Sequence, residues 1–454
     1  MTTAQSLPVT AGFDAEWGAR ALARAAEAHE PQWALERRRA AEAFARALPF
    51  PNREDELWRR TDFHALEAAL PTLDPFSATA RARGVDDLPA AIVERLAGEA
   101  GNAALVVQRN GDVVLEQTHP ELVRQGVVVG SLDRGFREHG ARLQEAFGSL
   151  LASDYDRYVA IGAALSAGGA FVWVPDGVTA ALPIRLFHWL DGAGRLAAPR
   201  TVVILGRESH ATVIEEMLSE PGESSEAADA VAFHDGGSEL FVGDGSKLVY
   251  GTLQNWGPSV YHYSNHRARV GGGAELQWIQ TVLGGRVAKA NSYFDLAGPG
   301  ASAYVHGFMF GDQRQHFHLH TLQRHLVPHT TSDLLIKCCL KDRARSVYQG
   351  LIQVSEGAQR TDAYQANRNL LLSEQARADS IPGLEILAND VRCTHGATIG
   401  HVDAEQMYYL QSRGLPHLDA QRLIVEGFFA PVLDRIPLES VRDQLRGVIR
   451  RKIG

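Results

Sequence analysis

The middle of the chain, from Gly168 to about Val391, is a long succession of short β-branched and aromatic segments separated by glycine-rich turns. Segments such as AFVWVPDGV, TVVILG, KLVYGTLQ and AYVHGFMFG have the length and composition of β-strands. No convincing amphipathic helix interrupts them, which argues against a fold built from strand–helix–strand units. The pattern therefore predicts a mainly β fold, and it leaves a sandwich, a large barrel and a coil of stacked rungs as alternatives.

Helical sequence precedes this region. Residues 14–70 are rich in alanine, leucine, arginine and glutamate, and Pro51 ends the longest helical run among them. Further along, Asn110 and Gly111 stand between two β-type runs and predict a hairpin. An acidic, serine-rich insert over residues 218–237 predicts a mobile loop rather than a regular element.

Helical sequence also follows the β region. Asp403 is placed as a helix N-cap, with Gln406 three residues later and Gly414 as the stop. Pro431 predicts a bend or break in the next helix. We expect three regions: N-terminal helices in 1–100, a β core in 101–400 and C-terminal helices in 401–454.

Composition and missing motifs exclude several classes of protein. A net charge of −9 gives no basic surface for nucleic acid, and no segment approaches the roughly 20 apolar residues of a membrane span. The first residues lack a secretory pattern, so we expect a cytoplasmic protein whose three cysteines are free thiols. The sequence contains no phosphate-binding loop, dinucleotide fingerprint, nucleophile elbow or His-Glu-x-x-His motif, and so shows no sign of nucleotide hydrolysis.

Six of the eighteen histidines fall within 24 residues. They are His306, His316, His318, His320, His325 and His329. On a strand, His316, His318 and His320 share a face, so two of them could reach one metal ion. No carboxylate or thiolate stands at ligand spacing, and the nearest acids are Asp312 and Asp333. We therefore favour a ladder of hydrogen-bonded histidines, with a stand-alone metal-dependent enzyme of cupin-like β fold as the alternative.

A second candidate site lies in the segment LEILANDVRCTHGAT. If a strand continues through it, Val391, Cys393 and His395 share a face, and the last two begin about 6.6 Å apart along the chain. Both could then reach one metal or sulfur species, and a histidinium would lower the pKa of the thiol. The alternative is plain burial, which is common for free cysteine. The adjacent Cys338 and Cys339 must face opposite ways on a strand, so we expect one in the core.

Several long segments together resemble the SufB/SufD family of iron–sulfur cluster assembly proteins, and most closely its SufD subunit. They are DELWRRTDF, GGAFVWVPDGV, TLQRHLVPHTTSDLLIKCCLKDRARSVYQGLIQV, TDAYQANRNLLLSEQARADSIPGLEILANDVRCTHGATIG and DAEQMYYLQSRGL. The resemblance covers nearly the whole chain. It implies a right-handed parallel β-helix core between two helical regions, and thus selects stacked rungs among the three alternatives.

The resemblance also implies partners and a role. The chain is expected to be a non-catalytic scaffold that pairs with a SufB-like paralogue, while a SufC-like ABC ATPase docks on residues 403–453 and binds the ATP. A transient iron–sulfur cluster or iron is expected at the heterodimer junction. A flavin in the complex and a homodimer of the isolated chain stay open. The expected docking residues are Asp403, Tyr408, Tyr409, Arg413, Phe428 and Phe429.

By resemblance, His395 matches the family histidine at the junction between the two paralogues, where it would bind metal, and Cys393 matches the cysteine two residues before it. The SufB-type paralogue carries Glu-His-Glu around the equivalent histidine and an essential cysteine upstream. Here Gly396 follows the histidine, and the upstream segment QANRNLLLSEQ contains no cysteine. Both differences indicate the SufD-like subunit, and they imply that this chain alone does not hold a complete cluster.

Overall fold

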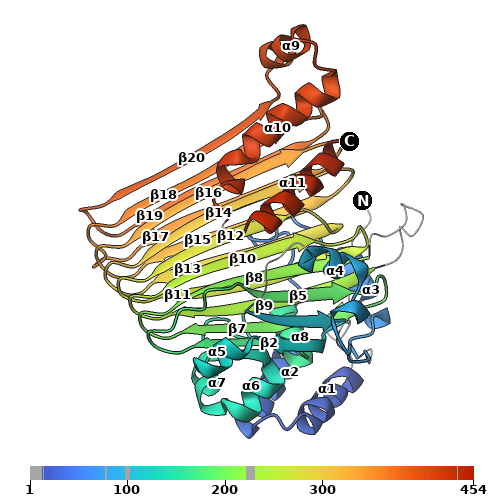
Figure 1. The fold of residues 1–454 in the computed structure, drawn as a ribbon, viewed down its shortest axis with the longest axis vertical. Coiled ribbons are helices and arrows are strands. Elements are labelled where there is room, and N and C mark those ends of the chain that lie inside the picture. The colour runs from blue at the N-terminus through green and yellow to red at the C-terminus, as the bar shows by residue number, and fades with distance from the viewer. Residues whose placement is uncertain (1–12, 14, 77–78, 98–102, 221–230, 437) are drawn as a thin grey trace.

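Two long sheets dominate the computed structural model, which describes residues 13–454 apart from 14, 77–78, 98–102, 221–230 and 437. Together the sheets form a parallel β-helix of about eight turns, with helices at both ends (Figure 1). This confirms the prediction of a mainly β fold. Successive strands in each sheet come from successive turns of the β-helix, which excludes both a sandwich of antiparallel sheets and a cupin-like barrel.

The first sheet contains ten strands. It begins with the predicted hairpin, whose turn places Asn110 and Gly111 at φ values of 52° and 90°. Every other pairing in this sheet is parallel. Its strands, in spatial order, are β2 (Asp112–Thr118), β1 (Ala104–Arg109), β5 (Ile184–Leu190), β8 (His210–Ser219), β10 (Lys247–Asn255), β12 (Glu275–Val282), β14 (Ser302–Gly311), β16 (Thr331–Leu340), β18 (Asp362–Leu371) and β20 (Arg392–His401).

The second sheet lies opposite the first across the core. Its β3–β4 pair is antiparallel, and its later pairs are parallel. In spatial order its strands are β19 (Arg377–Ile386), β17 (Arg345–Val354), β15 (His316–His325), β13 (Val287–Leu296), β11 (Val260–Val270), β9 (Ala232–Val242), β7 (Arg200–Leu205), β4 (Ala170–Val174) and β3 (Val128–Ser131), with the short β6 (Leu196–Ala197) paired to β9.

The helices fall into three groups along the chain. The first group is α1 (Ala15–Glu27), α2 (Gln32–Ala47), α3 (His64–Ala69) and α4 (Ala90–Leu96), with single 3-10 turns at Leu70–Thr72 and Val85–Asp87. The second is α5 (Pro120–Arg124), α6 (Leu132–Glu138), α7 (Gly140–Ala146) and α8 (Arg157–Leu165), and it lies inside the span predicted as β core. The third is α9 (Ala404–Ser412), α10 (His417–Leu433) and α11 (Glu439–Ile453).

Alternate residues of each strand point into the β-helix, where apolar side chains from both sheets form one large core. One inward-facing row runs in register through seven strands of the first sheet. Its members are Val213, Tyr250, Trp278, Val305, Leu334, Gln365 and His395. All of them except His395 are buried, because a further turn covers each one.

Helices cover the outer faces of both sheets. On the second sheet, α1, α2, α8 and the segment carrying Trp58 and Phe63 enclose a cluster that includes Tyr158 and Tyr263. On the first sheet, α10 and α11 pack over β14 and β16 around Phe308 and Phe429. Because helices cover the outer faces, outward-facing strand residues in the middle turns are apolar or buried, as the inward-facing residues are.

Two predictions need correction. The mobile loop was predicted over residues 218–237, but Leu218 and Ser219 end β8, and residues 232–237 form the buried start of β9, because His234 and Asp235 lie beneath other elements rather than in solvent. Residues 221–230 of that loop lie outside the described residues. Of the predicted bend or break at Pro431, the break is wrong, since α10 continues to Leu433, and burial of Val432 and Leu433 holds this last turn in place.

Candidate functional site

The C-terminal end of the β-helix is open. β20 ends the first sheet and β19 ends the second, so within the described part of the chain each has a strand neighbour on one side only. Figure 1 shows these strands at the end of the stack farthest from the N-terminal helices. Their outer edges present backbone N–H and C=O groups that another chain can pair with.

Cys393 and His395 lie on β20 and point the same way, as the alternation along a strand predicts. His395 is in register with the buried Gln365, and Cys393 with the buried Ala363. Both side chains therefore continue inward-facing rows of the β-helix. His395 is exposed and Cys393 half-buried because no further turn in the described chain covers them.

The thiol of Cys393 is not activated within this chain. Burial raises its pKa, and the charge of Asp362 raises it further. The sequence suggested that a neighbouring histidinium would lower this pKa, but partial burial against the apolar cluster around Ile352 and Val354 raises it instead. A bound metal ion or a cationic residue of a partner would favour the thiolate.

Apolar side chains surround the open end. Tyr364, Leu384 and Ile386 are each 38% exposed, Ile399 is 50% exposed, and Leu387 is 60% exposed. They come from β18, β19, β20 and the residue after β19. Such a group of exposed apolar residues beside two unpaired strand edges is typical of a surface that binds another protein.

A buried polar network lies directly beneath His395. The hydroxyl of Tyr348 lies 3.2 Å from Oε1 of Gln365 and 3.0 Å from Oγ1 of Thr321. The amide nitrogen of Gln365 donates to the backbone oxygens of Gly350 and Gly383 at 3.3 and 3.1 Å. These bonds hold Gln365 in place. Because Gln365 directly precedes His395 in the inward-facing row, they define the surface beneath His395.

The predicted histidine cluster is divided among different surfaces. On β15, His316, His318 and His320 point outward from the second sheet, where Oγ1 of Thr61 lies 3.2 Å from His316 and 2.6 Å from His318. His318 also contacts Gln349 at 2.8 Å. Burial lowers the pKa of His316 to about 4 and that of His320 to about 3.

The other three histidines of that segment are placed elsewhere. His306 contacts Arg435, His325 points inward and bonds to Thr330 and Ser332, and His329 occupies a turn at positive φ. No three His, Cys, Asp or Glu side chains among the described residues are grouped to hold a metal ion. Hydrogen-bonded histidines are therefore the interpretation that the geometry supports.

Cys338 and Cys339 face opposite sides of β16, as predicted, but both are buried. Cys338 lies in the core of the β-helix, and Cys339 lies under the C-terminal helices. Burial raises the pKa of Cys338 to about 12 and also raises that of Cys339. Both are inert core residues in this structure.

Sequence reasoning missed a polar cluster inside the first turns of the β-helix. Nε2 of His188 lies 2.6 Å from Oε1 of Glu215, which also accepts a hydrogen bond from Thr201 at 2.8 Å. Ser238 donates to the second carboxylate oxygen at 3.1 Å and lies 3.0 Å from Nδ1 of His266. The sequence signal that could have indicated this cluster is the presence of polar residues at alternate positions of otherwise apolar strands, as in VYHYSNHRARV.

Electrostatics make this cluster one unit. Burial acts to raise the pKa of Glu215, but the hydrogen bond and charge of His188, with the charge of His266, bring it down to about 2. Burial lowers the pKa of His262 to about 3 and that of His266 to about 4. Partners in this network come from strands far apart in sequence, so it helps to specify the register of the stacked turns.

At the other predicted surface, α9 leaves the body of the protein (Figure 1). Asp403 caps it by accepting hydrogen bonds from the backbone N–H groups of Glu405 and Gln406. Tyr408 is 75% exposed and Tyr409 57% exposed, and Arg413 lies over the ring of Tyr409. No residue of α9 is buried, and Met407 and Leu410 are half-buried, so most of the surface of this helix is available to another protein.

The two phenylalanines predicted to contact a partner are used mainly inside the chain. Phe429 is fully buried against Phe308 and Phe310, with ring centroids 4.9 and 6.1 Å away. Phe428 is half-buried beside it and lies under the ammonium group of Lys337. The surface that α10 leaves exposed instead includes Leu418 and Leu423, which are 39% and 52% exposed.

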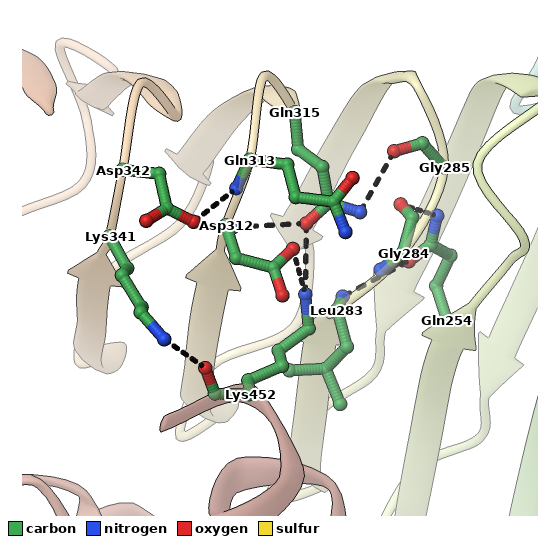
Figure 2. A network of polar contacts seen from close by, with 10 residues as sticks. All are labelled: Gln254, Leu283, Gly284, Gly285, Asp312, Gln313, Gln315, Lys341, Asp342 and Lys452. Carbon is green, nitrogen blue, oxygen red and sulfur yellow. Dashed lines mark hydrogen bonds and ion pairs between the residues drawn. The ribbon is translucent and has the colours of Figure 1, made fainter. Parts of the chain in front are cut away.

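The end of α11 is fixed to a row of turns of the β-helix, as Figure 2 shows. Nζ of Lys452 donates to Asp312 and Gln315 at 2.9 Å each. Lys341 donates to the backbone oxygen of Ile453 at 2.8 Å, and Gln315 donates to the backbone oxygen of Gly285 at 3.1 Å. These contacts join the helix to three successive turns, so α11 is a fixed part of the body.

Comparison with known proteins identifies the chain. The family model described as "SUF system FeS cluster assembly, SufBD core domain" matches residues 188–428, and that described as "SufBD protein N-terminal region" matches residues 99–186. The chain belongs to the SufBD family. The SufBD core match runs from β5 into α10 and includes the open end, and the N-terminal match covers the hairpin and α5 to α8.

SufBD relatives match most of the chain. The iron-sulfur cluster assembly protein SufD of Bacillus subtilis (strain 168) is 28% identical over 428 residues, which cover 93% of this chain and 95% of the relative. A SufBD family protein of Mycobacterium tuberculosis is 31% identical over 57% of this chain and 68% of its own length. The SufB protein of Bacillus subtilis is 25% identical over 74% of this chain and 71% of its own length.

None of the described helices is long and apolar enough to cross a membrane.

Proposed function

We propose that this chain is the SufD-like scaffold subunit of a cytoplasmic complex that assembles iron–sulfur clusters. It pairs with a SufB-like paralogue through the open end of its β-helix, and a SufC-like ABC ATPase docks on its C-terminal helices. The chain catalyses no reaction and binds no ATP, and iron or a nascent cluster is the cargo held at the junction. Likeness to SufD over nearly its whole length supports this subunit assignment over the SufB-like one.

One observation carries the proposal: His395 and Cys393 end inward-facing rows on a strand whose outer edge pairs with no other strand among the described residues. A second β-helix placed against β19 and β20 would satisfy the free backbone groups and cover the exposed apolar side chains around them. It would also enclose the imidazole and the thiol between two chains. Imidazole and thiolate are both suitable ligands for iron, and two ligands leave positions for groups of the paralogue.

The docking of the ATPase rests on the exposure of α9. Its two tyrosines and Arg413 offer aromatic and cationic groups of the kind enriched at protein interfaces. α11 is fixed to the body. α9 follows β20 directly, so a protein bound at α9 has a short connection to the junction.

The pairing can be tested with two variants of equal exposure. Leu387→Asp places a charge beside the open end, and Val123→Asp places the same charge on α5, since both native residues are 60% exposed. In co-expression with the paralogue and the ATPase, Leu387→Asp should lose the paralogue while Val123→Asp retains it. Equal recovery of the paralogue with both variants would contradict pairing through this end.

The role of the histidine is tested in the intact complex. His395→Ala should retain both partners but yield far less protein-bound iron and sulfide under anaerobic conditions than the native complex. His64→Ala is the matched control, because its side chain is 70% exposed on α3 at the N-terminal region. Normal cluster content in His395→Ala would show that the residue serves only the packing of the junction.

A further inference from the structure

Gln365 follows apolar residues in an inward-facing row just beneath the open end of the β-helix. The two members before it in this row are Val305 and Leu334, and the member after it is His395. Gln365 is completely buried. Burial of an amide is unfavourable unless its polar atoms find partners, whereas a leucine at this position would need none. The amide is therefore explained by its hydrogen bonds and not by the filling of the core.

The hydrogen bonds of Gln365 connect the two sheets. Its Nε2 donates to the backbone oxygen of Gly350 on β17 at 3.3 Å and to that of Gly383 on β19 at 3.1 Å. Gln365 itself lies on β18, which pairs with β20 from end to end. The side chain thus joins the last strand of the second sheet to the strand that carries β20. Both N–H groups of the amide are used in this way, so no donor is left for the imidazole of His395.

The oxygen of the amide is fixed as well. The hydroxyl of Tyr348 donates to Oε1 of Gln365 at 3.2 Å, and Nε2 of Gln323 lies 3.5 Å from the same atom. A Cβ atom added at Gly350 would overlap both Oε1 of Gln365 and the hydroxyl of Tyr348. Gly350 does not have a positive φ, so its lack of a side chain serves space rather than backbone conformation. The network therefore holds the amide in one orientation.

The two strands at the open end depend on such a link. β19 and β20 each have a strand neighbour on one side only within the described part of the chain. The bond from Gln365 to Gly383 limits the separation of these strands at the level of His395, because Gln365 and His395 are register partners on adjacent strands. Groups that orient a metal ligand without touching the metal typically change metal affinity by about 10- to 100-fold when they are removed.

We propose that Gln365 is a positioning residue for the cargo site at the junction. It holds β19 against β18 and so keeps the imidazole of His395 in the position that binds iron. Gln365 acts through the two strands and not by contact with the metal, because both of its N–H groups are already donated to backbone oxygens. Iron binding by His395 is part of the proposed function, on which this inference rests.

Cobalt(II) is the probe, because its visible absorption reports the number and kind of its ligands. It is titrated under anaerobic conditions into the complex of this chain with the paralogue and the ATPase. The signal is the part of the absorption that the complex with His395→Ala lacks. Gln365→Met keeps the approximate volume of the side chain but cannot donate to Gly350 or Gly383. It should retain both partners and bind cobalt(II) about tenfold more weakly than the native complex.

Gln254→Met is the matched control. Gln254 lies on β10 of the same sheet, far from β20 in the strand order, and is 3% exposed. It donates to the backbone oxygen of Gly284 at 2.7 Å and accepts from the backbone N–H groups of Leu283 and Gly284 at 3.1 and 3.0 Å (Figure 2). The same substitution thus removes a similar set of buried hydrogen bonds away from the junction. It should lower the unfolding midpoint as Gln365→Met does, but bind cobalt(II) like the native complex.

Gln365→Leu is the second variant if Gln365→Met does not assemble, since Leu334 fills the same row one turn earlier, and it should show the same loss. Thermal unfolding checks that all variants are folded. The inference is overturned, and the proposed function stands, if the Gln365 variants give the native signal while His395→Ala lacks it. It is equally overturned if Gln254→Met binds cobalt(II) as weakly as Gln365→Met, which would show a general effect of stability. Native absorption with His395→Ala would refute the ligand role itself, and the inference with it.

Discussion

Replacement of His320 by glutamine should weaken the pH dependence of stability. Burial, with the charges of Lys289 and Arg267, lowers the pKa of His320 from 6.5 to about 3. Its Nδ1 lies 2.6 Å from the hydroxyl of Tyr293. Because the folded pKa lies below the unfolded one, the unfolded chain binds more protons below pH 6.5, and stability is lost as the pH falls from there toward 3.

The magnitude follows from the width of this window. Each pH unit between the two pKa values contributes about 1.4 kcal/mol, so neutral His320 accounts for about 2 kcal/mol of the stability lost between pH 6.5 and 5. Urea unfolding of the native chain and of His320→Gln, followed by tryptophan fluorescence at several pH values, measures this difference in slope. His64→Gln is the control, because its exposed side chain should leave the slope unchanged. Equal slopes for the native chain and His320→Gln would refute the reasoning.

Three further predictions concern the C-terminal helices. Phe429→Ala removes a fully buried ring and should lower the free energy of unfolding by about 3–5 kcal/mol, measured by urea unfolding; a loss under 1 kcal/mol would contradict the packing. Lys452→Met removes the bonds to Asp312 and Gln315, so amides of α11 should exchange hydrogen at least tenfold faster by mass spectrometry, whereas unchanged exchange would show that apolar packing alone fixes the helix. Tyr408→Asp should reduce co-purification of the ATPase at least tenfold without changing the unfolding midpoint, and full recovery of the ATPase would exclude this residue from the interface.

Local patterns predicted the β core well. The hairpin at Asn110 and Gly111, the shared direction of Cys393 and His395, and the capping of α9 by Asp403 all depend on residues near in sequence. Stacked rungs were selected by family resemblance, because alternation along a strand is the same in a sandwich, a barrel and a β-helix.

What the sequence could not predict depends on contacts between turns. The polar residues at the start of β9 were predicted as a loop, because the residues that contact His234 belong to strands distant in sequence. The burial of Cys339 and Phe429 depends on the packing of α10 over the first sheet, which no local pattern encodes. The exposure of His395 likewise follows from the end of the stack, a property of the whole fold.

The short connection between β20 and α9 has a mechanical consequence. Only Val402 and Asp403 separate the last strand residue from the first helical residue, so a pull on α9 is carried as tension along β20. The ladder of backbone hydrogen bonds between β20 and β18 resists this load in shear, with all of its bonds strained together. His395 lies six residues from the end of that strand, a distance of about 20 Å in extended chain. Force applied at the exposed helix thus reaches the imidazole through a stiff link rather than through a flexible loop.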